Sequence, residues 1–96
     1  MLRPYELVVI VSPEVQDDTV PQVAERVTKF ITDLGGQVES QNIWGRRRLA
    51  YPIARFIEGN YVLTHLQMEP SASASLESNL KLNEEVIRHL LVRRDS

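Results

Sequence analysis

The alternation of apolar and polar residues in the first third of the chain predicts a strand followed by a helix. Residues 3–11 end in an unbroken apolar run rich in β-branched side chains, which is typical of a central β-strand. Apolar residues then recur at helical spacing from Val20 to Leu34. Asp17 or Asp18 is expected to cap this helix, and Gly35-Gly36 to end it in a left-handed turn.

The remaining pattern predicts two more strands, a helix and a last strand. A long second strand runs over residues 37–53, and Gly59-Asn60 supplies a turn signal before a third strand over 61–68. The link over 52–59 is expected to form a mobile hairpin tip. Leucine and alanine spacing predicts a helix over 70–82 that begins at a proline, and β-branched residues predict a strand over 85–94.

This order is β-α-β-β-α-β, which predicts an α+β, ferredoxin-like single domain over residues 1–96. Right-handed crossovers place both helices on one face of a four-stranded antiparallel sheet and leave the other face bare. Alternation sends Leu7 to the covered face, and Val8, Ile10, Tyr61 and Leu63 to the bare one. A contiguous apolar patch there would mark a partner site; the alternative is a scatter of surface hydrophobic residues.

Composition excludes several classes of protein. The 96 residues contain no cysteine, so neither a disulfide nor a thiolate metal site can form. No His/Asp/Glu cluster has metal-ligand spacing and no glycine-rich phosphate loop is present, so no metal, cofactor or small-molecule substrate is expected. No apolar run approaches the roughly 20 residues that span a bilayer, and Glu6 interrupts any signal-peptide pattern. We expect a location in the cytoplasm or an organelle matrix.

The most unusual stretch is Trp44-Gly45-Arg46-Arg47-Arg48-Leu49-Ala50-Tyr51-Pro52-Ile53. On a strand, Arg46 and Arg48 would share one face and Arg47 would lie on the other, and Gly45 could permit a bulge. The formal net charge is −2, yet nine of the eleven basic residues are arginines, whose planar fork matches phosphate oxygens. This pattern favours a local basic patch facing an anion; the alternative is a solvated charged face.

With these motifs in view, the sequence resembles the bacterial small-subunit ribosomal protein six family over nearly its whole length. The decapeptide 44–53 is the most specific part of the resemblance. The other motifs that carry it are Arg3-Pro4-Tyr5-Glu6, Gly35-Gly36, Glu58-Gly59-Asn60-Tyr61, Leu82-Asn83-Glu84 and Ile87-Arg88-His89. The resemblance implies a structural protein of the ribosome without catalytic activity. It also implies binding to the central domain of small-subunit ribosomal RNA, on the platform, as a heterodimer with ribosomal protein eighteen.

Two sets of residues are candidates for these contacts. Phosphate contacts are expected to come from a pool of arginines: Arg3, Arg46, Arg47, Arg48, Arg88, Arg93 and Arg94. Contacts with the protein partner are expected from aromatic and apolar residues: Trp44, Tyr51, Val8, Ile10, Tyr61 and Leu63. A salt bridge from Arg88 to Glu6 on the neighbouring strand is an alternative for that arginine. Trp44 could also pack in the core or stack on a base.

Three rival classes share parts of the pattern. An RNA-recognition motif would need glycine and aromatic alternation on the third strand, which this sequence lacks. An isomerase with a histidine base would rest on His65 or His89, although a lone strand histidine is more often a neutral, hydrogen-bonded side chain. A ligand-binding module that dimerises through its sheets is not excluded by any residue, and it would be a homodimer when purified alone.

Overall fold

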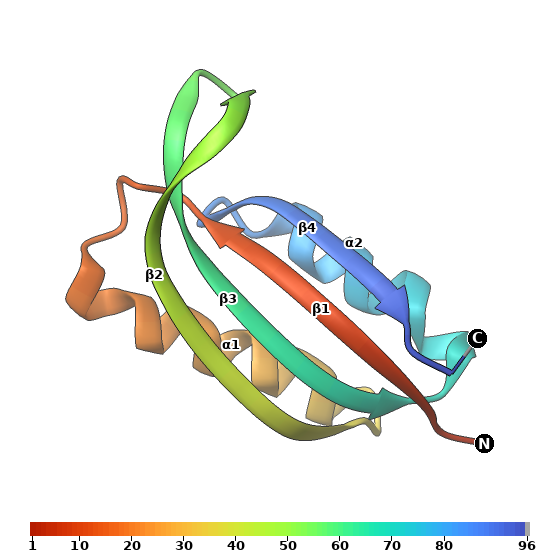
Figure 1. Ribbon diagram of the computed structural model, residues 1–96. Coiled ribbons are helices and arrows are strands. Elements are labelled where there is room, and N and C mark those ends of the chain that lie inside the picture. The colour runs from red at the N-terminus through yellow and green to blue at the C-terminus, as the bar shows by residue number, and fades with distance from the viewer. Residues whose placement is uncertain (96) are drawn as a thin grey trace.

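The computed structural model describes residues 1–95 and has the predicted order of elements. The four strands pair only in antiparallel fashion, in the order β2-β3-β1-β4, as Figure 1 shows. The ferredoxin-like fold is therefore confirmed. The bounds of the elements are β1 Arg3–Val11, η1 Asp17–Thr19, α1 Val20–Asp33, β2 Gln37–Ile53, β3 Phe56–Met68, η2 Pro70–Ala72, α2 Ser73–Leu82 and β4 Val86–Arg93, where η1 and η2 are single turns of 3-10 helix.

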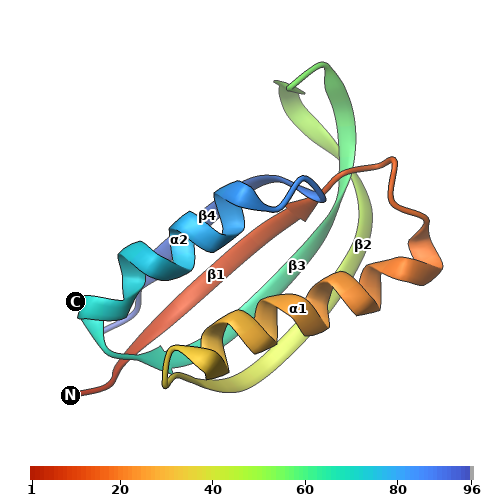
Figure 2. The same ribbon diagram turned by 180° about the vertical axis from the view of Figure 1, so that it is seen from behind.

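The core lies between the sheet and the two helices, which cover the same face of it (Figure 2). The predicted alternation of β1 is confirmed, because Leu7, Val9 and Val11 are fully buried beneath the helices. Each helix adds an apolar stripe, with Val23, Val27 and Ile31 from α1 and Leu76 and Leu80 from α2. Full burial of one such side chain contributes about 1.5–3 kcal/mol to stability. The opposite face of the sheet carries no helix of the described chain.

The start of α1 differs from the prediction. Its N-cap residue is Thr19, and neither Asp17 nor Asp18 caps the helix with its side chain. Pro21 lies in the first turn, where the missing N–H donor does no harm. The aspartate prediction was wrong because the carboxylate of Asp17 accepts hydrogen bonds from the β2–β3 hairpin instead. The predicted glycine end is confirmed, since Gly35 adopts a φ of 84°.

The hairpin between β2 and β3 turns within the predicted link over 52–59, but its turn is tighter and β3 begins earlier than predicted. Gly59-Asn60 is not a turn but lies within β3, and the chain reverses at Ala54 and Arg55, which adopt φ values of 48° and 69°. Gly59 instead permits a close approach. A Cβ atom at Gly59 would lie 2.5 Å from the side chain of Ile10. The glycine therefore allows β3 to cross β1 closely rather than to turn.

The hairpin extends past the end of β1 as an arm formed by residues 46–58. The last pair between β1 and β3 joins Val11 to Asn60, and beyond it β2 and β3 pair only with each other. Figure 1 shows the arm projecting beyond the sheet and curling over its bare face. The register of β2 shifts at Gly45, which has a φ of 89°, so the predicted bulge is confirmed at the base of the arm. The bulge increases the local twist that bends the arm.

Candidate functional site

The bare sheet face gathers the apolar residues that were predicted to contact a protein partner. Val8 pairs with Leu63 and Ile10 with Tyr61, so the four side chains are cross-strand neighbours on the face opposite the helices. The six predicted residues come from β1, β2 and β3: Val8, Ile10, Trp44, Tyr51, Tyr61 and Leu63. Ile10 is only 7% exposed and forms a floor rather than a protruding contact.

Trp44 lies at the edge of this face and does not enter the core. Its ring stacks on that of Tyr61, with centroids 6.2 Å apart and planes inclined by 8°. The guanidinium of Arg47 lies 5.4 Å from the centroid of Trp44, within range of a cation–π interaction. Trp44 nevertheless remains 46% exposed, so the core alternative is wrong. The stacked side chains of Tyr61, Trp44 and Arg47 therefore connect the bare face to the arm.

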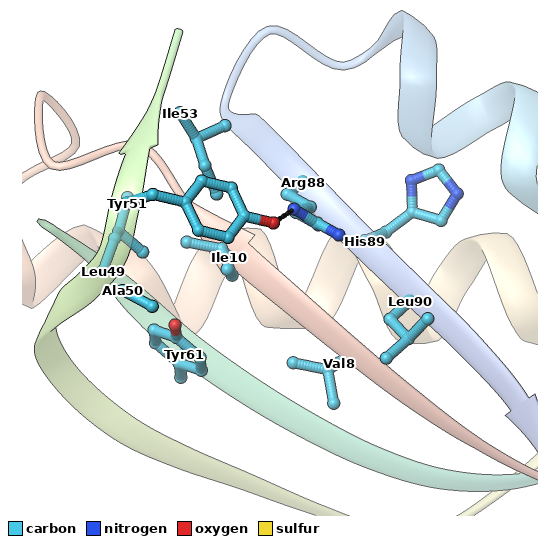
Figure 3. A pocket seen from close by; sticks show the side chains of 10 residues that line it. All are labelled: Val8, Ile10, Leu49, Ala50, Tyr51, Ile53, Tyr61, Arg88, His89 and Leu90. Atoms are coloured by element: carbon cyan, nitrogen blue, oxygen red, sulfur yellow. Dashed lines mark hydrogen bonds between the residues drawn. The ribbon is translucent and has the colours of Figure 1, made fainter. Parts of the chain in front are cut away.

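A pocket of about 240 Å³ lies where the arm curls over the sheet (Figure 3). Val8 and Ile10 of β1 and Leu90 of β4 contribute apolar side chains to it, and Leu49 and Tyr51 contribute from the arm. The remaining lining residues are Ala50, Ile53, Tyr61, Arg88 and His89. Sequence reasoning missed Leu49 and Leu90 as site residues, because only the curl of the arm brings β2 over the edge strand β4.

Arg88 lies at this pocket and reaches the arm, not Glu6. Its guanidinium donates a hydrogen bond to the hydroxyl of Tyr51 and lies 5.8 Å from the centroid of that ring. Figure 3 shows the two side chains directed toward each other. Glu6 instead lies 3.3 Å from Nε2 of His65. The alternative of an Arg88–Glu6 salt bridge was wrong because the register places Arg88 beside Ile10, four residues further along β1.

Arg46 is bound to the protein itself. It donates to Asp17 at 2.8 Å, to Glu58 at 2.9 Å and to the carbonyl of Pro13 at 3.2 Å. Asn60 donates to the same carboxylate at 3.2 Å. The hydrogen bond from Arg46, followed by that from Asn60, lowers the pKa of Asp17. Arg46 thus ties the base of the arm to the loop between β1 and α1.

Three further arginines of the predicted pool also have acidic partners. Arg93 donates to both carboxylate oxygens of Asp95, at 2.7 and 3.1 Å, and Arg3 lies 3.7 Å from the same carboxylate. Arg94 pairs with Glu39 and also donates to the carbonyl of Tyr5 at 3.1 Å. The hydrogen bond from Arg93 lowers the pKa of Asp95, and that from Arg94 lowers the pKa of Glu39. An anion would have to compete with these carboxylates.

The other arginines of the pool, Arg47, Arg48 and Arg88, have no acidic group within ion-pair distance among residues 1–95. Arg55 joins them at the tip of the arm, where its guanidinium lies 5.5 Å from the centroid of Phe56. Arg55 was not part of the predicted pool. The arm therefore carries three exposed arginines that have no acidic partner in the described part of the chain, and Arg88 faces it from β4.

The two histidines do not form a catalytic pair. His65 lies beside Glu6 on the bare face, whereas His89 is mostly buried and lies 3.0 Å from Glu77 of α2. Within the described part of the chain, no group of His, Asp and Glu side chains is placed to hold a metal ion. None of the described helices is long and apolar enough to cross a membrane.

Comparisons with known proteins agree with this geometry. The family model of ribosomal protein S6 matches residues 4–93. The chain belongs to the ribosomal protein S6 family. It is 44% identical over 94 residues to the small ribosomal subunit protein bS6 of Mycolicibacterium paratuberculosis, with 98% of each chain covered. It is 38% identical over 92 residues to the bS6 protein of Desulforamulus reducens, with 96% of this chain and 97% of that one covered.

Solved structures extend the comparison. The crystal structure of ribosomal protein S6 from Thermotoga maritima has a TM-score of 0.91 and 29% identity, covering 98% of this chain and 89% of that one. The C-terminal domain of the MgtC protein from Mycobacterium tuberculosis has a TM-score of 0.66 at 16% identity, which is a likeness of fold alone. Membership of the S6 family confirms the expectation of a non-enzymatic, structural protein of the small ribosomal subunit.

Proposed function

We propose that this protein binds the central domain of small-subunit ribosomal RNA, on the platform, together with ribosomal protein eighteen. The observation that carries the proposal is the bare sheet face, where exposed apolar and aromatic side chains adjoin arginines that have no acidic partner within residues 1–95. Apolar surface of this kind suits a protein partner, and free guanidinium groups suit phosphate. The two kinds of contact occur side by side on the arm, as a heterodimer on RNA requires.

The net charge of −2 explains why both partners are needed. Non-specific affinity for RNA comes from local neutralisation of phosphates, and a near-neutral protein with a few free arginines supplies little of it. Burial of the apolar face against a second protein would add affinity that is independent of salt. The location that follows is the ribosome, in the cytoplasm or in an organelle matrix.

The test is a binding titration of the purified protein with a central-domain fragment of small-subunit ribosomal RNA, with and without ribosomal protein eighteen, over a series of salt concentrations. We expect tight binding only with the partner present, and a logarithmic affinity that falls linearly with the logarithm of salt. Binding to neither molecule, with a stable homodimer in solution, would overturn the proposal and favour the ligand-binding module.

Matched arginine variants show which side chains reach the RNA. Arg47→Met should reduce the salt slope of RNA binding by about 0.7–0.9, which is the share of one phosphate contact. Arg26→Met is the control, because Arg26 lies on α1 and pairs with Glu85, away from the arm. An unchanged slope for Arg47→Met would remove Arg47 from the contact set.

A further inference from the structure

The pocket beneath the arm has the size and lining of a site for one or two side chains. Its volume of about 240 Å³ is below the range of about 300–1,000 Å³ that is common for drug-sized ligands. Its floor is apolar, with Ile10 and Leu49 nearly buried and Val8 partly so. Leu90 remains 55% exposed at its edge. A single aliphatic or aromatic side chain would cover this remaining apolar surface.

Charge at the pocket is one-sided. Arg88 has no acidic partner among residues 1–95, and its recorded hydrogen bond to the hydroxyl of Tyr51 uses only one of its two terminal nitrogens. A guanidinium carries five N–H donors and keeps its charge at any physiological pH. Because Arg88 is held against the Tyr51 ring, its remaining donors are oriented beforehand toward an incoming acceptor. The group that best matches the Arg88 guanidinium is a carboxylate on the partner, next to the apolar side chain that enters the pocket.

We propose that this pocket binds a segment of the protein partner in which an aliphatic or aromatic side chain enters the cavity and a neighbouring carboxylate pairs with Arg88. The inference rests on the proposed function and adds to it the chemistry by which the partner is recognised. It also moves Arg88 from the RNA-contact pool to the protein interface. The arm then has two roles, with Arg47, Arg48 and Arg55 left for phosphate.

Two other occupants fit the pocket less well. A nucleotide base would bring polar edges against a floor formed by Val8, Ile10 and Leu49, where their hydrogen bonds would be lost. A second copy of this chain would have to supply the carboxylate from the same face in a two-fold contact. The acids on that face, Glu6 and Glu39, already lie against His65 and Arg94. A different protein is therefore the occupant that the charges favour.

The first test measures the affinity for purified ribosomal protein eighteen without RNA, by isothermal titration calorimetry. We expect Arg88→Glu to weaken binding by about tenfold to a hundredfold, as reversal of a charged interface contact does. Arg88→Met should weaken it less, because the aliphatic stem of the side chain is kept. Lys29→Glu is the matched control: it makes the same change in charge on the exposed side of α1, away from the pocket lining, and should stay within about twofold.

A charge-reversal rescue identifies the carboxylate. Each Asp and Glu of ribosomal protein eighteen is changed to Arg in turn, and one of these variants should restore binding to the Arg88→Glu protein. The melting temperature of each variant of this chain is measured alone, so that a loss of folding is recognised. If the melting temperature is unchanged and Arg88→Glu still binds within twofold of wild type, the pocket assignment is wrong.

A second test separates the protein contact from RNA contact. With the preformed heterodimer on the central-domain RNA fragment, Arg88→Met should leave the salt slope unchanged, whereas Arg47→Met should lower it. A lower slope for Arg88→Met would return Arg88 to the RNA-binding set and overturn the inference. Failure of the wild-type chain to bind ribosomal protein eighteen at all would overturn the proposed function too. If the wild-type chain binds ribosomal protein eighteen and the Arg88 variants bind it equally well, only the pocket assignment is overturned.

Discussion

The two faces of the central strand β1 both carry aliphatic side chains, but they are covered by different means. Leu7, Val9 and Val11 are fully buried under the helices, whereas Val8 and its neighbours Leu63 and Leu90 lie on a face that no helix of the described chain covers. Leu90 and Val92 of the adjacent strand are 55% and 45% exposed. Apolar side chains on both faces of one sheet indicate that one face is covered within the chain and that the other is suited to a second molecule.

The arginines divide in the same way. Arg46, Arg93 and Arg94 are bound to carboxylates of the chain and contribute to its architecture, whereas Arg47 and Arg48 are exposed without such partners. Consecutive residues of one tripeptide thus differ in role, because Arg46, at the base of the arm, reaches Asp17 and the carbonyl of Pro13, whereas Arg47 and Arg48 lie further along the arm. An arginine in the sequence indicates a group that could bind phosphate. The tertiary structure decides whether its guanidinium is already paired with a carboxylate of the chain.

The largest effect should come from truncation on the covered face. Leu76→Ala removes a fully buried side chain of α2 and should lower the free energy of unfolding by about 2–5 kcal/mol. Leu90→Ala, the same change on the bare face, should stay within about 0.5 kcal/mol. Urea unfolding of both variants measures the contrast. Equal losses would show that the bare face contributes to the core of the isolated protein.

A smaller loss is expected where the arm crosses β1. Gly59→Ala places a Cβ 2.5 Å from the side chain of Ile10 and 3.0 Å from the carbonyl of Val11, so β3 must shift, at a cost of about 1–3 kcal/mol. Amide hydrogen exchange should also become faster within the arm, residues 46–58. Gly45→Ala is the control, because its φ of 89° adds backbone strain without any atom within 4 Å. Unchanged exchange in the Gly59 variant would show that the crossing does not hold the arm.

A functional effect of a few-fold is expected from the contact between the arm and the acidic loop. Asp17→Asn weakens the attachment of Arg46, and it should reduce binding to RNA and ribosomal protein eighteen by about threefold. Simple electrostatics makes the opposite prediction, because removing an acid should favour RNA. Asp18→Asn removes the same charge one residue away, where the carboxylate accepts a hydrogen bond from Thr19 and does not contact Arg46. Stronger binding by both variants would refute the positioning role.

The smallest effect is a dependence of stability on pH. Arg46, Arg94 and Arg93 lower the pKa values of Asp17, Glu39 and Asp95 respectively, below their ordinary values of 3.8 for Asp and 4.5 for Glu. Below those values the unfolded chain binds more protons than the folded one, so stability rises with pH there. The contribution is complete above about pH 5 and is lost as the pH falls through the lowered pKa values.

Unfolding by urea between pH 2 and pH 7 measures this dependence. Asp17→Asn should lose less stability than wild type over the acidic part of the range, because an amide does not titrate. Asp18→Asn again serves as the control. Identical acid profiles for wild type and Asp17→Asn would show that the Asp17 carboxylate has the same pKa in the folded and unfolded chain.

Local patterns of the sequence determined the order of elements and the faces of the strands. Alternation in β1 and β3 and the helical spacing of α1 are properties of neighbouring residues, and so is the bulge at Gly45. The decapeptide 44–53, together with the order of elements, indicated the family, because its three arginines between aromatic residues form an unusual local pattern.

Tertiary structure alone decided which charged and polar groups meet. Asp17 was predicted to cap a helix and Gly59 to form a turn, yet each serves a contact with a residue far away in the chain. The junction of Tyr51 with Arg88 depends on how far the arm twists after its bulge and on the register of β4. Such contacts join residues 29 to 49 positions apart, so no local propensity encodes them, and only the folded sheet brings the groups together.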